Sequence, residues 1–201
     1  MTRSADSEEQ TFYHAGQRAL QDEFDSRRLA DRLEETTRRT AFTAKDRDFI
    51  SSRTMFFLAT ADPVGRPDCS YKGGRPGFVH VVDDTTLVFP NYDGNGQFRS
   101  LGNIVANPSV GLLFIDFDSP GRLRVNGAAS LVRDAAQLTD FPGAQLLVQV
   151  RVTDIFPNCP RYIHPAAQQT LSVYAPAAGH TPPEPEWKRM PVFEPYLPRK
   201  P

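Results

Sequence analysis

The sequence predicts a mainly β protein, an antiparallel barrel or sandwich with flanking helices. Short β-type runs separated by turn residues begin at Met55, whereas the first fifty residues are charge-rich with helical spacing, and proline is concentrated after residue 175. A chain of 201 residues that is 39% hydrophobic suits one core with appendages rather than two full domains. We therefore expect a helical extension over 1–52, a barrel domain over 53–174 and an extended arm over 175–201.

The amino-terminal extension has the pattern of a mostly solvated helix followed by a shorter one. Leu20, Phe24, Leu29 and Leu33 recur at spacings of four, five and four residues with charges between them, which gives one apolar stripe. Thr43 followed by Asp46 resembles a capping arrangement for a second helix that reaches about Ser52. Two such helices cannot form a core alone, so we expect them to pack on the rest of the chain.

The central region reads as strands with one helical interruption. The helix is expected over 97–106, with Phe98, Leu101 and Val105 on one face and Pro108 shortly after its end. Turns are expected at 62–65 and 82–84, where Pro, Gly and Asp favour the required backbone angles. The expected strands are 55–61, 67–71, 78–82, 86–89, 110–117, 123–132 and 146–156.

The carboxy-terminal segment is expected to be an extended arm that lies along a surface, although its proline content is also typical of a disordered tail. It carries apolar side chains that a free linker does not need. Eight of the 18 prolines lie there (Pro176, Pro182, Pro183, Pro185, Pro191, Pro195, Pro198 and Pro201), together with Trp187, Met190, Phe193, Tyr196 and Leu197.

The charge and cysteine content narrow the classes of partner. Lys and Arg number 23 against 24 for Asp and Glu, so the chain lacks the one-signed field of a nucleic-acid or membrane-surface binder. We expect a small-molecule or protein partner. Two distant cysteines, Cys69 and Cys159, cannot make a disulfide framework or a four-thiolate zinc site. No apolar run approaches the length needed to cross a bilayer, and we expect a soluble, cytoplasmic protein.

Two segments carry groups suited to a phosphate. Residues 70–79 read SYKGGRPGFV, in which Ser70 supplies a hydroxyl and Lys72 a cation beside a glycine-rich turn. Residues 89–100 read FPNYDGNGQFRS, in which the polar loop leads into the expected helix with Arg99 in its first turn. Each segment alone is equally typical of an ordinary turn, and neither matches a P-loop or dinucleotide motif.

Several short motifs succeed one another in an order that resembles the split-barrel flavoproteins related to pyridoxamine 5′-phosphate oxidase. The likeness covers roughly residues 12–164. Its motifs are FYH at 12–14, FLATAD at 57–62, GRP at 65–67, SYKGG at 70–74, PGFV at 76–79, NI at 103–104, NP at 107–108, GLLF at 111–114 and LRVNG at 123–127. The resemblance implies a six-stranded antiparallel split barrel that forms a homodimer and binds FMN at the subunit interface.

The resemblance also implies roles for individual residues. The phosphate of FMN is expected at Ser70, Lys72, Arg99 and Ser100, with Asn95 and Gln97 close by. The isoalloxazine ring is expected against Pro76, Gly77, Phe78 and Val79, with Asn126 at the ring edge.

The segment 156–164, which reads FPNCPRYIH, resembles a motif after the last strand of one uncharacterised branch of the family. Cys159 beside Arg161 is a candidate reactive thiolate, and His164 is a candidate proton donor to a substrate. The alternative is that Cys159 is a small buried residue and His164 a structural hydrogen-bonding group. His14 and His80 are expected to be structural, and Cys69 to lie in the core.

The chain departs from true pyridoxamine 5′-phosphate oxidases in one respect. Those enzymes end in an Arg-x-His substrate motif, whereas Arg161 and His164 are differently spaced and placed. We therefore expect an FMN-dependent oxidoreductase that acts by hydride transfer on another small molecule. The alternatives are a flavin-binding or redox-sensing module without turnover, or a related protein that uses a deazaflavin or haem.

Overall fold

The structure, a computed structural model, describes residues 11–119, 121–159, 163, 176–184, 189 and 191. The chain divides into two compact units, Met1–Arg39 and Thr40–Pro201.

The first unit contains two helices where the sequence predicted one. Helix α1 (Ala15–Glu23) and helix α2 (Arg27–Thr37) are separated at Asp25, which adopts a φ of 48°. A positive φ at a residue other than glycine cannot continue a right-handed helix, so the pattern is broken there. The predicted stripe of Leu20, Phe24, Leu29 and Leu33 consequently stays exposed within this unit.

The start of α1 is fixed by a reciprocal cap. The backbone N–H of Gly16 donates to Nδ1 of His14 at 3.2 Å, and the His14 N–H donates to Oε1 of Gln17 at 2.9 Å. These two bonds satisfy backbone donors that the first helical turn leaves without partners. The structural role expected for His14 is confirmed.

Helix α3 (Ala44–Ser51) opens the second unit. The predicted cap is present, because the Asp46 N–H donates to Oγ1 of Thr43 at 3.2 Å and the Thr43 N–H donates to Oδ2 of Asp46 at 2.9 Å. Arg47 then ties the helix to the barrel by donating to the Val81 carbonyl and pairing with Asp84. The compact unit that contains the barrel begins at Thr40 and includes this helix.

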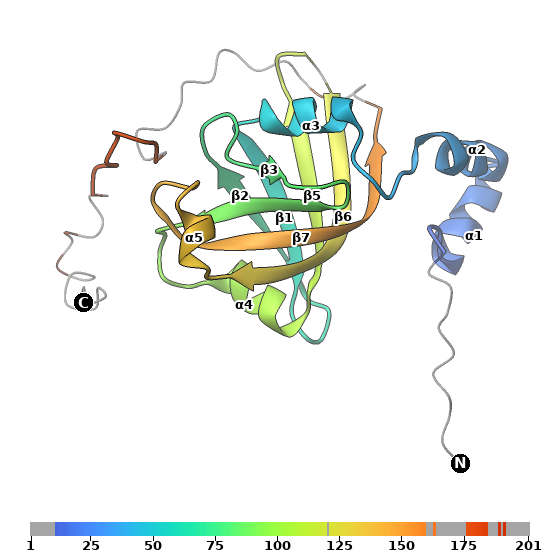
Figure 1. The fold of residues 1–201 in the computed structure, drawn as a ribbon. Helices are drawn as coiled ribbons and strands as arrows, with labels where there is room; N and C mark the ends of the chain where they lie inside the picture. The colour runs from blue at the N-terminus through green and yellow to red at the C-terminus, as the bar shows by residue number, and fades with distance from the viewer. Residues whose placement is uncertain are drawn as a thin grey trace. The chain divides into compact units, whose positions relative to one another are not determined.

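A single antiparallel sheet forms the barrel, and the mainly β split-barrel class is confirmed. Its seven strands run in the order β2-β1-β5-β6-β7-β4-β3, so the expected count of six is wrong by the short strand β3. Helices α3 and α4 lie at opposite ends of this sheet (Figure 1). The strands are β1 (Met55–Ala61), β2 (Pro67–Gly73), β3 (His80–Val81), β4 (Thr86–Tyr92), β5 (Ser109–Asp116), β6 (Gly121–Val132) and β7 (Ala144–Pro157).

Strands β2 and β4 both end later than the sequence predicted, and these two extensions matter for the site. Strand β2 continues to Gly73 rather than ending at Tyr71, because Lys72 and Gly73 pair with Phe56 and Met55 of β1. Strand β4 continues to Tyr92 rather than ending at residue 89 through its pairing with β7. The pairing partner, which the sequence does not reveal, decides where each strand stops.

The core is aromatic at its centre. The Phe56 ring is fully buried and packs on Phe89 and Phe114 with centroid distances of 4.9 and 5.0 Å, and on Phe78 at 5.9 Å. Aromatic pairs at these separations contribute beyond the area that they bury. This cluster packs β1, β4 and β5 together in the centre of the core.

Helix α4 (Arg99–Ala106) starts two residues later than predicted. Its buried side chains are Ser100, Leu101 and Ile104, whereas Val105 is 72% exposed. The predicted apolar face is therefore right at Leu101 and wrong at Phe98 and Val105, because Phe98 lies before the helix and the second buried apolar residue is Ile104.

The remaining described elements are short. Helix α5 (Ala135–Leu138), which the sequence did not predict, comes after β6. In the expected arm, residues 177–180 form a turn that is closed by a bridge between Ala177 and His180. The apolar residues singled out there (Trp187, Met190, Phe193, Tyr196 and Leu197) lie outside the described residues. None of the helices among the described residues is long and apolar enough to span a bilayer.

Candidate functional site

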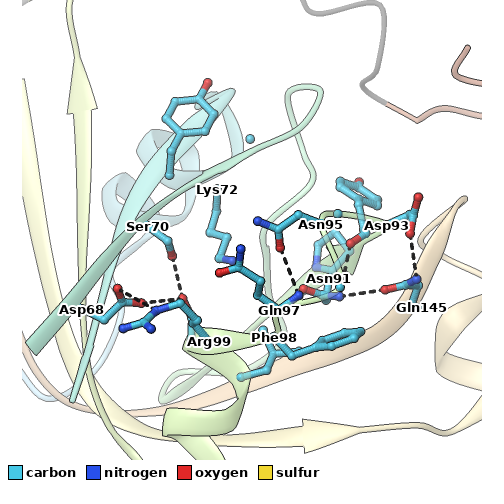
Figure 2. Close-up of a pocket in the computed structure, with 18 of the residues that line it drawn as sticks. Asp68, Ser70, Lys72, Asn91, Asp93, Asn95, Gln97, Phe98, Arg99 and Gln145 are labelled. Atoms are coloured by element: carbon cyan, nitrogen blue, oxygen red, sulfur yellow. Dashed lines mark hydrogen bonds and ion pairs between the residues drawn. The ribbon is translucent and has the colours of Figure 1, made fainter. Parts of the chain in front are cut away.

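A hollow of about 810 Å³ opens between strand β2, the end of β4 and the first turn of α4 (Figure 2). This volume lies within the range typical of small-molecule sites. Its lining comprises residues 68–73 of β2, 90–101 from β4 through the next loop into α4, and Gln145 of β7.

The hollow brings together the two segments that the sequence singled out for a phosphate. Ser70 and Lys72 reach it from β2, and Arg99 and Ser100 reach it from α4. Asn95 and Gln97 line it from the loop between β4 and α4. All six residues expected around the phosphate therefore face one space, although the two segments are far apart in the sequence.

The hydroxyl groups and Arg99 gather around a carboxylate. The Ser100 hydroxyl, which is buried, lies 3.0 Å from the Ser70 hydroxyl and 3.3 Å from Oδ2 of Asp68. Arg99 Nε lies 3.8 Å from Oδ1 of the same aspartate, and the Arg99 side chain is 70% exposed. We call Asp68, Ser70, Lys72, Arg99 and Ser100 the charged end of the hollow.

Lys72 is the half-buried cation of this end. Burial lowers the pKa of its ammonium group below the usual value for lysine, and the negative charge of Asp68 acts in the opposite direction. A cation that has lost part of its hydration gains more from an anionic ligand than a fully solvated one. Lys72 is thus poised to bind an anion.

The first turn of α4 adds backbone donors to the charged end. Its N-cap residue Phe98 has a φ of 48° and makes no capping hydrogen bond through its side chain. The turn before it is built by Gly96, with a φ of 75°, and by Asn95, whose Oδ1 accepts from the Gln97 N–H. The positive end of the α4 dipole favours an anion beside it.

The other end of the hollow is built from amides. Asn91 Nδ2 donates to Oε1 of Gln145 at 3.1 Å and to the Tyr92 carbonyl at 3.2 Å, and Gln145 Nε2 donates to Oδ1 of Asp93 at 3.4 Å. We call Asn91, Asp93 and Gln145 the amide end. Figure 2 shows Gln97 between the two ends, beside Lys72.

The direction of the Asn91 amide is determined by its partners. A backbone carbonyl and a carboxylate can only accept hydrogen bonds. The Tyr92 carbonyl therefore orients the NH₂ group of Asn91 toward itself, and the Asp93 carboxylate orients Gln145 so that its Oε1 accepts from the same NH₂ group. The Asn91 carbonyl oxygen is left without a partner among the described residues. The amide end therefore offers an acceptor to a ligand that carries an N–H or O–H group.

Two exposed aromatic rings belong to the lining, Tyr71 at 61% and Phe98 at 51% exposure. The Tyr71 ring lies so close to Gly73 that a Cβ at this glycine would stand 2.7 Å from its Cε1. A side chain at position 73 would therefore make the exposed Tyr71 ring turn away. These rings give the hollow apolar surface beside its charges.

The residues expected to contact an isoalloxazine ring do not line the hollow. Phe78 and Val79 are buried in the barrel core, and Gly77 forms a turn with a φ of 85° after the exposed Pro76. Asn126 lies within β6, opposite Gly111 of β5. The structure therefore separates this set from the phosphate set.

The cysteines and histidines differ in how well their expected positions agree with the structure. Cys69 is exposed and lines the hollow, so its expected core position is wrong; β2 is an edge strand with no fully buried residue. Cys159 is also exposed, contrary to the buried alternative, and lies just beyond the end of β7 remote from Gln145. His80 packs on Phe141 with a centroid distance of 4.3 Å, as a structural residue does. His164 lies outside the described residues.

Sequence reasoning missed Asp68 and Gln145. Asp68 had a readable signal, because it precedes Ser70 and Lys72 at the two-residue period of one strand face. Gln145 had none, since only the pairing of β4 with β7 brings it beside Asn91.

Comparisons with known proteins place the barrel in a family. The family model described as pyridoxamine 5′-phosphate oxidase matches residues 42–159. A comparison with curated proteins found no match.

Among solved structures, HupZ of Group A Streptococcus is 18% identical, with 63% of this chain and 100% of that chain covered and a TM-score of 0.47. General Stress Protein 26 of Bacillus anthracis is 17% identical, with 54% and 87% covered and a TM-score of 0.43. An FMN-binding protein of Syntrophomonas wolfei is 15% identical, with 70% and 95% covered and a TM-score of 0.40. The family match rests on the family model, which spans more than half of the chain. This protein belongs to the pyridoxamine 5′-phosphate oxidase family.

Proposed function

We propose that the hollow binds the phosphate of FMN at its charged end and that the protein is an FMN-dependent oxidoreductase. The observation that carries this proposal is the convergence of β2 and α4 on one space, with Lys72, Arg99, Ser70 and Ser100 in its lining. The family to which the chain belongs supports a flavin as the ligand.

The residues present fit a phosphorylated ligand. Two cations, two hydroxyl groups and the amide groups at the start of α4 supply charge-assisted and neutral donors to phosphate oxygens. A phosphate buried without such partners would incur a large desolvation cost, and these donors offset that cost. The donor set is thus suited to an anion, and the volume to a molecule larger than phosphate alone.

The side chains of the two ends would have different roles. Lys72 and Arg99 would balance the charge of the phosphate, and Ser70 and Ser100 would hold its oxygens. Asn91 would accept a hydrogen bond from an uncharged part of the ligand. When bound, FMN supplies hydride-transfer chemistry, and the protein supplies orientation and electrostatics.

The visible spectrum and a fluorescence titration test the proposal together. The purified protein should show flavin absorbance, and the apoprotein should bind FMN at least about tenfold more tightly than riboflavin, because one charge-assisted hydrogen bond contributes about 1.5–3 kcal/mol. Equal affinity for FMN and riboflavin would contradict the phosphate assignment. A Soret band in place of flavin absorbance would contradict FMN.

The oxidoreductase part of the proposal has its own measurement. Anaerobic mixing of the FMN-loaded protein with NADPH or NADH should bleach the flavin rapidly. A flavin that stays oxidised with both donors would favour a binding or redox-sensing module.

A further inference from the structure

Asp68 is a carboxylate placed among the groups that would hold a phosphate. It lies on the same face of β2 as Ser70 and Lys72, and its side chain is 24% exposed. Its two oxygens are divided between the partners, with Oδ2 at 3.3 Å from the Ser100 hydroxyl and Oδ1 at 3.8 Å from Arg99 Nε. The Asp68 carboxylate therefore already interacts with donors that a bound phosphate would use.

A bound phosphate must share these donors with Asp68. Arg99 is largely exposed and can turn toward a ligand, whereas the buried Ser100 hydroxyl has one proton for Asp68, Ser70 or a phosphate oxygen. The side chains of the charged end also carry a net charge of only one, since Lys72 and Arg99 are cations and Asp68 is an anion. A phosphomonoester carries about −1.5 to −2 at pH 7, and a phosphodiester carries about −1.

We propose that Asp68 is a specificity-determining residue that penalises the second negative charge of a phosphate bound at the charged end. The inference rests on the proposed function, because it assigns a preference to the same phosphate site. The net side-chain charge of +1 neutralises a singly charged phosphate and leaves the second charge of a doubly charged one uncompensated. FMN then binds less tightly than the donor set alone would allow.

The test compares three flavins with the same ring and ribityl chain: FMN, its singly charged phosphate methyl ester, and riboflavin, which has no phosphate. Apoprotein is titrated by flavin fluorescence for wild type and Asp68→Asn, which keeps an acceptor for Ser100. Asp68→Asn should tighten FMN about tenfold and the methyl ester about threefold, from Coulomb repulsion in a partly exposed site. Riboflavin affinity should not change.

Two further variants separate this account from its competitors. Asp68→Ala should also tighten FMN, and a gain confined to Asp68→Asn would overturn the proposal, because the new amide would then be acting as a donor to phosphate. Asp93→Asn removes the same charge from the amide end of the same hollow. This variant should leave the ratio of FMN to riboflavin affinity unchanged. If it tightened FMN as much as Asp68→Asn does, the effect would not be local to Asp68 and the proposal would be overturned.

The remaining outcomes are also decisive. Weaker FMN binding by Asp68→Asn would mean that Asp68 positions Arg99 and Ser100 and does not compete with the ligand. If wild type prefers FMN to riboflavin and Asp68→Asn gains nothing, this inference alone fails. If wild type binds FMN and riboflavin equally, the proposed function and the inference fail together.

Discussion

The two ends of the hollow differ in how their side chains are held. At the amide end, Asn91 and Gln145 are oriented by groups that accept hydrogen bonds only, so their direction is set before any ligand arrives. At the charged end, Ser100 and Arg99 face the Asp68 carboxylate, and a ligand anion must compete with it for these donors. The difference predicts that the amide end orients a ligand, whereas the charged end decides which charge it carries.

Asn91→Leu tests the role of the amide end and should lower flavin affinity more than the pH change described next. Loss of one oriented acceptor should weaken FMN and riboflavin alike by about five- to tenfold, since a net hydrogen bond contributes about 1 kcal/mol. Fluorescence titration with both flavins measures it. A loss confined to FMN would mean that the amide end also recognises phosphate, and the division between the ends would be wrong.

A smaller effect is expected from pH. Burial lowers the pKa of Lys72 in the free protein, and an anion bound beside it would raise that pKa. The contribution of Lys72 to FMN binding is therefore fully present below the free pKa and is lost as pH rises from that value through the higher pKa of the complex. FMN affinity should therefore fall several-fold at alkaline pH, earlier than an ordinary lysine would cause. Riboflavin controls for ionisation of the shared ring, and Lys72→Arg should remove the fall. An unchanged fall in Lys72→Arg would assign it to another group.

The sequence predicted the donors of the charged end, although not Asp68, because local rules apply there. The two-residue period of β2 places Ser70 and Lys72 on one face, and the turn chemistry of residues 93–98 places Arg99 at the start of a helix. The register of β1 with β2 and the packing of α4 then bring the two segments together. The resemblance carried by the order of the motifs was needed to predict that the two segments lie together, because residue spacing alone does not predict it.

Elsewhere tertiary packing overrode the sequence pattern. Phe78 and Val79 follow the glycine-rich turn that begins directly after Lys72, yet both side chains are buried in the core. The close approach of the Phe78 ring explains why position 74 is a glycine. The break at Asp25 and the true face of α4 depend on single backbone angles at Asp25 and Phe98 that composition does not reveal. The expected homodimer and the role of His164 stay predictions.

The central claim is that Lys72 on β2 and Arg99 on α4 hold one phosphate. A double-mutant cycle tests it most directly, with FMN and riboflavin titrated against wild type, Lys72→Ala, Arg99→Ala and the double variant. Arg66→Ala is the matched control, because Arg66 is 82% exposed, pairs with Asp62 and lies outside the hollow.

Each single variant should weaken FMN by about one to two orders of magnitude and leave riboflavin nearly unchanged. The double variant should lose less than the product of the two losses, because a phosphate freed from one cation is no longer fixed beside the other. Arg66→Ala should bind both flavins like wild type. FMN binding that matches wild type in both single variants, or equal losses of FMN and riboflavin, would contradict the shared phosphate site.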